Sequence, residues 1–328
     1  MTDDASDSPH AVTAADLERH ERFAERGTLR VAITGATGLV GRALVPFLAG
    51  GGHEVRRLVR SRASLGPGDV YWNPAAGEID ADALDGLDAV IHLAGETVAE
   101  RWTIAHKRAI RESRVQGTGL LARTLAGLPR PPRVLLSASA IGYYGDGGDR
   151  ELDETSPPGS DFLANVAREW EEAAAPAARR GIRVVHPRFG VILSARGGAL
   201  ERLLPPFQLG AGGKIASGKQ WMSWIALDDV VGALHFLLYT DSLAGPVNLT
   251  APNPLTNADF GHVLGHVLHR PAVATVPAFA LRMMFGEMAD TMLLAGQRVL
   301  PRKLLAAGFQ FRHPTLEEAL RWELGKAR

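Results

Sequence analysis

Three glycines at a regular spacing are the residues of this chain whose chemical purpose is clearest. Gly35, Gly38 and Gly41 form the pattern G-x-x-G-x-x-G directly after an apolar run at residues 31–34, and a helical pattern follows at 42–49. A strand, a glycine turn and a helix N-terminus together bind the pyrophosphate of a dinucleotide, because the unpaired N–H groups of the helix face the anion. The spacing therefore predicts a dinucleotide site.

Each glycine of this turn has its own expected role. Gly35 permits the tight turn, Gly38 lets the backbone approach the phosphates, and Gly41 lets the helix pack closely against the strand. A glycine turn without a ligand is the alternative, and the strand before it and the helix after it make that alternative less favoured. The remaining residues expected to contact the cofactor here lie between the glycines: Thr37, Leu39 and Val40.

The end of the second predicted strand, residues 52–60, indicates which dinucleotide is bound. An acidic residue at this position would hold the ribose 2′-hydroxyl of NAD, but the chain has Arg60, Ser61 and Arg62 there. A guanidinium binds a 2′-phosphate through paired, charge-assisted hydrogen bonds. The sequence therefore favours NADP(H) over NAD(H), and a solvated basic loop stays open as the alternative.

Two serines and two tyrosines after a later predicted strand are the candidates for catalysis. Ser139, or Ser137 two residues earlier, can hydrogen-bond a substrate oxygen, and Tyr143 or Tyr144 can donate a proton. We assign these roles to Ser139 and Tyr144. A small residue packed beneath the cofactor is the alternative for Ser137, and an aromatic cap on the loop is the alternative for the tyrosines.

The elements that must position these residues alternate along the chain. Strands are predicted at residues 31–34, 52–60, 88–95, 133–139 and 183–193. Helical patterns lie between them, which predicts right-handed crossovers and an α/β fold with a Rossmann-type doubly wound parallel sheet. Ligands bind such sheets at the carboxyl ends of the strands. Four candidates fall at strand ends: Gly35, Arg60, Gly95 and Ser139.

The length of 328 residues suits a dinucleotide domain and a smaller lobe. We expect a disordered or linker tail at 1–28 and an NADP-binding Rossmann domain at 29–195, completed by 225–250. Residues 196–224 and 251–328 then form a C-terminal substrate lobe. Within it, glycines at 210–218 and two nearby tryptophans suggest a substrate lid, with a surface loop anchored by core tryptophans as the alternative.

The composition excludes several classes of function. The 36 basic residues balance the 36 acidic ones, so no net field favours nucleic acid or an anionic membrane. The chain has no cysteine, which rules out disulfides and thiolate metal sites and suits a cytoplasmic protein. No apolar run is long enough to span a bilayer, and the acidic, polar start is unlike a secretory signal. We expect a small-molecule substrate and no metal; a homodimer stays open.

With these features, the chain resembles the extended short-chain dehydrogenase/reductase superfamily, near the sugar-nucleotide epimerases. More narrowly it is similar to an atypical branch called epimerase family proteins, some of which carry the label of cell-division inhibitors. The resemblance spans about residues 29–324. The matching segments are 34–41, 92–96, 101–107, Ser113-Arg114, 137–145, 213–224, 247–254 and 294–311.

The resemblance implies an NADP-binding fold in which a second loop lines the cofactor cleft. It assigns this place to the backbone of Leu93, Ala94 and Gly95 and to the side chain of Glu96. A solvated loop carboxylate is the alternative for Glu96.

The chain departs from the superfamily at the catalytic residues. Its members use a Ser or Thr, a Tyr, and a Lys four positions after the Tyr, which lowers the pKa of the phenol. Here Phe162 and Val166 stand in the last two positions. Lys107 or Arg188 would have to assist instead, if the fold brings either close.

Two functions follow from these features. The first is an NADP(H)-binding epimerase or oxidoreductase for a small or nucleotide-linked carbonyl or alcohol, working without the Tyr-Lys pair. The alternative is a non-catalytic NADP(H)-sensing or scaffold protein.

Overall fold

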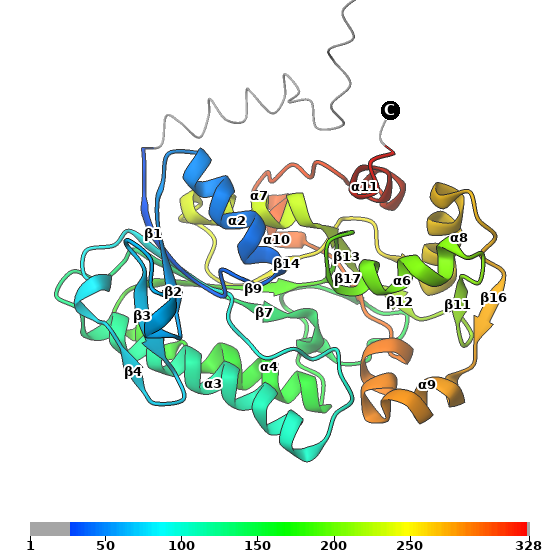
Figure 1. The fold of residues 1–328 in the computed structure, drawn as a ribbon, viewed down its shortest axis with the longest axis horizontal. Coiled ribbons are helices and arrows are strands. Elements are labelled where there is room, and N and C mark those ends of the chain that lie inside the picture. Colours follow the sequence, from blue (N-terminus) through cyan, green and yellow to red (C-terminus); the bar gives the residue numbers. More distant parts are fainter. Residues whose placement is uncertain (1–26, 327–328) are drawn as a thin grey trace, which may run out of the picture.

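A mostly parallel sheet forms the centre of the computed structural model, which describes residues 27–326 (Figure 1). Its strand order is β14-β9-β6-β5-β1-β2-β3-β4, and the short strand β7 pairs with β9. Only the β3–β4 pair of this sheet is antiparallel. The strands are β1 (Arg30–Thr34), β2 (Glu54–Val59), β3 (Val70–Asn73), β4 (Glu78–Ile79), β5 (Ala89–His92), β6 (Val134–Ser137), β7 (Ser139–Ala140), β9 (Arg183–Phe189) and β14 (Gly245–Leu249).

Helices cover both faces of this sheet, as a doubly wound fold requires (Figure 1). Helices α2 (Leu39–Gly50) and α7 (Leu227–Tyr239) lie on one face, and α3 (Ile104–Gly127), α4 (Phe162–Glu172) and α5 (Ala175–Arg179) lie on the other. Successive residues of β1 point to opposite faces, so Ile33 packs with α2 and Ala32 packs with α3. Two buried faces explain why the central strands are continuous apolar runs. The Rossmann-type α/β fold predicted from the sequence is therefore confirmed.

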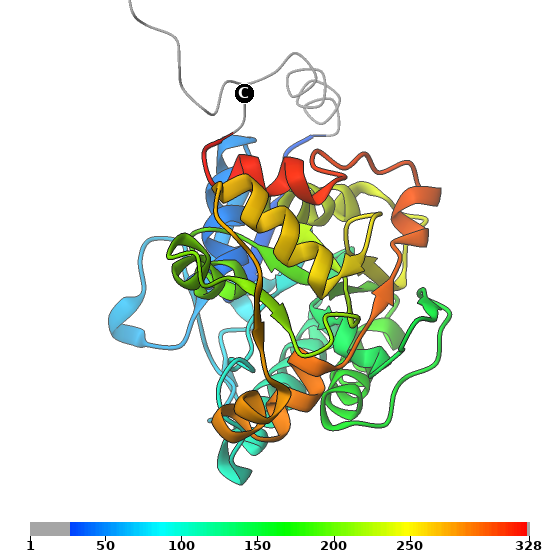
Figure 2. The same ribbon diagram turned by 90° about the vertical axis from the view of Figure 1, so that its right-hand side faces the viewer.

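The smaller lobe is built from short elements around its own apolar core, which includes Trp224 and Phe260. In Figure 2, α11 lies against α8. Within residues 27–326, no helix is both long and apolar enough to cross a membrane. Most of the tail expected at 1–28 lies outside the described residues. The elements around this core are β10 (Val191–Leu193), α6 (Gly198–Gln208), β11 (Gly213–Ile215), β12 (Trp221–Met222), β13 (Trp224–Ala226), β15 (Leu255–Thr256), α8 (Asn257–Leu268), β16 (Ala274–Val276) and α11 (Leu316–Glu323). The other C-terminal elements are α9 (Ala278–Phe285), β17 (Arg298–Val299), which pairs with β8 (Glu151–Leu152), and α10 (Arg302–Ala306), which packs on β14.

Close packing requires two glycines of the expected lid. A Cβ added to Gly212 would lie 2.4 Å from the ring of Phe207, and one added to Gly213 would lie 1.9 Å from the carbonyl oxygen of Ala274. Trp224 is fully buried. This part of the chain is therefore anchored in the lobe at both glycines and at the tryptophan.

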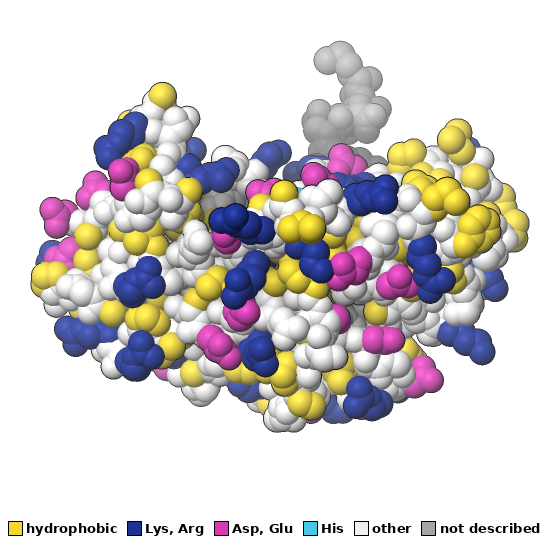
Figure 3. Space-filling view, turned by 90° about the horizontal axis from the view of Figure 1, so that it is seen from below, with side chains coloured by type: hydrophobic (Ala, Val, Ile, Leu, Met, Phe, Trp, Pro, Cys, Tyr) yellow, Lys and Arg dark blue, Asp and Glu magenta, His cyan; other side chains and the backbone are white. Residues whose placement is uncertain are grey.

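Basic and acidic side chains are interspersed on the face that Figure 3 shows, which includes α3 and α4. Ion pairs form along and between these helices, such as Arg108 with Glu112 and Arg111 with Glu169. Exposed pairs of this kind contribute little to stability. This face has the mixed charge expected from the balanced composition.

Thr34 joins the ends of β1 and β5 at the edge where the predicted site lies. Its Oγ1 accepts hydrogen bonds from the backbone N–H of Leu93 (3.0 Å) and of Ala94 (3.1 Å). The same Oγ1 lies 2.7 Å from Nδ1 of His92. Because the hydroxyl already accepts two hydrogen bonds, its own proton goes to Nδ1. This assigns the remaining ring proton of His92 to Nε2.

His92 continues this chain of hydrogen bonds beneath the sheet. Its Nε2 donates to Oγ1 of Thr118 in α3 (2.9 Å), which also accepts from the indole N–H of Trp170 in α4 (2.9 Å). Burial lowers the pKa of His92 to about 4. The imidazole is therefore neutral at pH 7, as the assigned tautomer requires.

This burial makes the stability of the fold sensitive to mild acid. An unfolded histidine titrates near pH 6.5, so protonation favours the unfolded state. Above about pH 6.5, His92 is neutral in both the folded and the unfolded protein, so the free energy of unfolding is highest there. This free energy decreases as the pH falls toward the pKa of about 4 in the folded protein. In urea denaturation, we expect His92 to reduce the free energy of unfolding by up to about 1.4 kcal/mol per pH unit in this window.

Two variants test the assignment to His92. His92→Asn removes the titrating group and should make the pH dependence of unfolding shallower. His262→Asn makes the same change at an exposed histidine and should leave that dependence as it is in the wild type. A wild-type slope in His92→Asn would show that another group is responsible.

Candidate functional site

The glycine turn leaves β1 and starts α2 with the geometry that its spacing predicts. Gly35 has a φ of +70°, and the N–H of Gly38 donates to the carbonyl of Gly35 (3.0 Å). A Cβ added to Gly41 would lie 2.2 Å from that same carbonyl oxygen, so the helix approaches the turn too closely for any side chain. Thr37 and Gly38 are exposed. The start of α2 is therefore open to a ligand from solvent.

The loop after β5 lies directly beside this turn and is held from below by α3. A Cβ added to Gly35 would lie 2.8 Å from the carbonyl carbon of Leu93. The N–H of Glu96 donates to Oγ of Ser113 (3.0 Å), and the Arg114 guanidinium donates to the carbonyl of Glu96 (2.9 Å). The loop between Leu93 and Glu96 is thus fixed at both ends.

Arg114 supports this loop in a way that its own sequence position does not predict. Its guanidinium stacks on the ring of Trp170, 4.9 Å from the centroid, and lies under Gly95. Burial lowers the pKa of Arg114 to about 10, against the opposing charge of Glu96, so the group stays charged at neutral pH. In the sequence, the only signal for this role is that Ser113-Arg114 is one of the segments that carry the family resemblance.

Beyond β2, Arg60 and Ser61 are exposed at the carboxyl edge of the sheet. Arg62 differs, because its guanidinium lies 3.9 Å from the ring centroid of Tyr71 and 3.9 Å from the carboxylate of Glu78. Arg62 is therefore already engaged with the β3–β4 hairpin, while Arg60 has no ion pair among the described residues.

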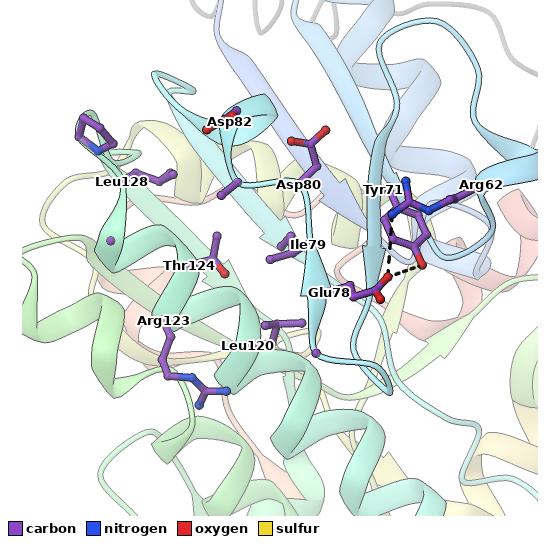
Figure 4. Close-up of a pocket in the computed structure, with 14 residues that line it drawn as sticks. Arg62, Tyr71, Glu78, Ile79, Asp80, Asp82, Leu120, Arg123, Thr124 and Leu128 are labelled. Atoms are coloured by element: carbon purple, nitrogen blue, oxygen red, sulfur yellow. Dashed lines mark hydrogen bonds and ion pairs between the residues drawn. The ribbon is translucent and has the colours of Figure 1, made fainter.

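A groove of about 800 Å³ begins at Arg62 and follows the β3–β4 hairpin along α3 (Figure 4). Arg62 and Tyr71 lie at one end of it and Leu128 lies at the other. None of the cofactor-binding residues predicted from the sequence lines this groove. It is distinct from the edge formed by the glycine turn and the loop after β5.

The candidate catalytic residue Ser139 lies in a buried network with Arg188. Oγ of Ser139 donates to Glu171 of α4 (2.7 Å), and Arg188 of β9 donates to both oxygens of the same carboxylate (2.7 and 2.8 Å). Arg188 is 2% exposed. Burial acts against its charge, but the hydrogen bonds and charge of Glu171 outweigh burial and raise the pKa of Arg188. Nearby, Ser137 is fully buried and its hydroxyl has no partner among residues 27–326.

Tyr144 belongs to the same network. Its hydroxyl donates to Oδ1 of Asn248 (2.7 Å) and accepts from Arg188 (2.9 Å). The guanidinium of Arg188 also lies 3.5 Å from the ring centroid of Tyr143. Burial raises the pKa of Tyr144 to about 12, against the opposing effect of Arg188. At neutral pH the phenol is therefore protonated, so it can donate or orient but cannot act as a base.

Lys107 and Arg188 are the two cations that could assist Ser139 and Tyr144. Arg188 lies beside them in the fold, whereas Lys107 pairs with a different carboxylate. Nζ of Lys107 pairs with Glu287 (2.8 and 2.9 Å) and lies 4.4 Å from the ring centroid of Phe162. Phe162 and Val166 belong to an apolar cluster with Trp102. The two positions at which we expect the superfamily's Tyr and Lys are therefore apolar.

Comparisons with known proteins agree with this architecture. Residues 31–249 match the model of the NAD dependent epimerase/dehydratase family, and residues 276–323 match a domain of unknown function, DUF1731. An epimerase family protein of Mycobacterium bovis is 46% identical over 291 residues, which are 88% of this chain and 96% of that protein.

Two solved structures are also similar along most of the chain. One is the nucleoside-diphosphate sugar epimerase of Corynebacterium glutamicum, with 40% identity, a TM-score of 0.77 and coverage of 95% of this chain and 63% of that one. The other is the human epimerase family protein SDR39U1, crystallised with NADPH, with 36% identity, a TM-score of 0.81 and coverage of 91% and 99%. This chain therefore belongs to the NAD-dependent epimerase/dehydratase family, among its epimerase family proteins.

Proposed function

We propose that this protein binds NADP(H) and acts as an epimerase or oxidoreductase on a small or nucleotide-linked carbonyl or alcohol. One observation carries the proposal: the glycine turn, Arg60-Ser61, the 93–96 loop and the Ser139–Tyr144 segment all follow strands at the carboxyl edge of one parallel sheet. The NADPH in the crystals of the human relative supports the choice of cofactor.

The residues at this edge fit a dinucleotide phosphate. A Cβ added to Gly38 would meet only the carbonyl of Gly35, at 3.3 Å, so the space above Gly38 is open. A pyrophosphate in that space would meet the N–H groups at the start of α2, including those of Leu39 and Val40. Arg60 and Ser61 would hold the 2′-phosphate, and the loop from Leu93 to Glu96 would line the other side. A nicotinamide would supply hydride transfer there.

Ser139 and Tyr144 are the proposed catalytic residues, and their hydrogen bonds define what each can do. The proton of Ser139 is directed at Glu171, so toward a substrate the hydroxyl would act as an acceptor unless it turns. The proton of Tyr144 is directed at Asn248, so donation to substrate requires the phenol to exchange this partner. The charge of Arg188 stabilises negative charge that develops on either oxygen.

A second function, NADP(H) sensing or scaffolding without catalysis, is favoured by a different observation. Phe162 and Val166 are part of an apolar cluster, and both candidate hydroxyls already donate to protein groups. Tight NADPH binding with no turnover in a broad screen, followed at the nicotinamide absorbance, would favour this function over the enzyme.

The first test concerns the pyrophosphate position. Gly38→Val should abolish NADPH binding measured by calorimetry, because its side chain would fill the space that the phosphates need, while the protein stays folded. Gly50→Val is the matched control, since Gly50 lies at the far end of α2 with open space around it. It should bind like the wild type. Wild-type affinity in Gly38→Val would mean that the phosphates lie elsewhere.

The second test concerns the 2′-phosphate. Removing its charge-assisted contact in Arg60→Ala should weaken NADPH binding about tenfold to a hundredfold and leave NADH binding nearly unchanged. Arg62→Ala should have a smaller effect, because that guanidinium is engaged with Tyr71 and Glu78. Equal losses for NADPH and NADH in Arg60→Ala, or tighter NADH binding in the wild type, would contradict the preference.

The third test concerns proton transfer. Tyr144→Phe should reduce turnover of a substrate by about 100-fold if this phenol transfers the proton, while NADPH affinity stays nearly constant. Tyr143→Phe removes a hydroxyl from the neighbouring ring that stacks on Arg188 and serves as the control. Wild-type turnover in Tyr144→Phe, or a larger loss in Tyr143→Phe, would remove Tyr144 from the catalytic role.

A further inference from the structure

A short segment of the DUF1731 region lies directly against the loop that follows the two tyrosines. This segment, residues 296–300, contains β17, and we call it the C-terminal strap. Its β17 pairs in parallel with β8 (Glu151–Leu152). The N–H of Gly147 donates to the carbonyl of Gly296 (2.8 Å), and Nε2 of Gln297 donates to the carbonyl of Gly145 (2.9 Å). The strap therefore holds the loop at residues 145–152 along most of its length.

The other side of the strap is fixed to the smaller lobe. Oγ of Ser223 donates to the carbonyl of Gln297 (2.7 Å) and accepts from the N–H of Val299 (2.8 Å). The N–H of Gln297 donates to the carbonyl of Trp221 (3.1 Å). Ser223 is 1% exposed. The strap thus connects the smaller lobe to the 145–152 loop.

The strap also reaches Tyr144 itself. Nδ2 of Asn248 donates to the carbonyl of Leu300 (3.0 Å), while Oδ1 of the same amide accepts from the Tyr144 hydroxyl (2.7 Å). Val299 is fully buried and packs in one apolar cluster with Tyr144 and Leu152. One amide and one apolar contact therefore connect the strap to the phenol.

The 145–152 loop needs such external support because of its own sequence. Gly145 and Gly148 have positive φ values, +62° and +56°, and glycine loses more conformational freedom on ordering than any other residue. Segments with few internal contacts open most readily in the native state. The hydrogen bonds from the strap offset this tendency at the residue next to Tyr144.

We propose that the C-terminal strap is a positioning element for the Tyr143–Tyr144 segment, with Gln297 as its positioning residue. Gln297 fixes the carbonyl of Gly145, and Leu300 fixes the amide that receives the Tyr144 proton. This inference rests on the proposed function, because it assigns the strap to the same site. It gives part of the DUF1731 region a role in placing residues of the larger domain.

The four tyrosines of the chain allow a test that needs no substrate. The protein is labelled with 3-fluorotyrosine, and its ¹⁹F resonances are assigned with the four Tyr→Phe variants. Gln297→Glu replaces the donating amide by a carboxylate that repels the Gly145 carbonyl. We expect it to shift or broaden the resonances of Tyr143 and Tyr144 and to leave those of Tyr71 and Tyr239, which lie in β3 and α7, in place.

Gln220→Glu is the matched control. Nε2 of Gln220 also donates to backbone carbonyls in this lobe, those of Ile215 and Leu293 (both 3.1 Å), but it bonds no residue of 141–152. It should leave all four resonances unchanged. Equal shifts of Tyr143 and Tyr144 in both variants, or no shift in Gln297→Glu, would overturn the proposal.

A second measurement covers the case in which Gln297→Glu does not fold. Gln297→Met keeps the length of the side chain and removes only its hydrogen bond. Amide hydrogen exchange of residues 145–152 should then be about fivefold faster than in the wild type, with exchange in β1 and β5 unchanged. Wild-type exchange in this loop would contradict the proposal. NADPH binding to the wild type is titrated separately. If the wild type does not bind NADPH, the proposed function fails, but the hydrogen-exchange result for the strap still stands.

Discussion

The hydroxyl of Thr34 is the contact on which the arrangement of the site depends most. By accepting from two successive N–H groups after β5, it fixes where the second loop leaves the sheet relative to the glycine turn. The two loops are then so close that any side chain at Gly35 would overlap the backbone of Leu93. The neutral state of His92 is part of this constraint, since only an unprotonated Nδ1 can accept the Thr34 proton.

A buried ion pair organises the opposite side of the carboxyl edge. Taking Arg188 and Glu171 out of water is costly unless their remaining hydrogen-bonding groups are also satisfied. Ser139 and Tyr144 supply those groups, so the two candidate catalytic hydroxyls also complete the network around the ion pair. A cation thus lies beside the phenol of Tyr144. This guanidinium is itself engaged by the carboxylate of Glu171.

The sequence predicts the glycine turn and its flanking elements well because their signals are local. The strand, the turn and the helix that hold Gly35, Gly38 and Gly41 are contiguous, and a parallel sheet follows from the alternation of elements. The partners of Ser139 and Tyr144 are instead 32 and 104 residues away, at Glu171 and Asn248. No local pattern marks such contacts.

Tertiary contacts decide the use of Arg62 and of two glycines in the expected lid. Arg62 is two residues from Arg60 in the sequence, but strand pairing brings Tyr71 and Glu78 within its reach. In the expected lid, Gly212 is required by packing against Phe207 and Gly213 by packing against Ala274. The residue type limits the roles that are possible at a position, and the tertiary contacts determine which of these roles it has.

We propose that the carboxyl edge of the sheet, and not the groove along α3, receives the dinucleotide. A crystal structure of the protein grown with NADPH tests this most directly. We expect the pyrophosphate at the backbone N–H groups that begin α2 and the 2′-phosphate at Arg60 and Ser61. NADPH bound in the groove between Arg62 and Leu128, with an empty glycine turn, would contradict binding at the carboxyl edge.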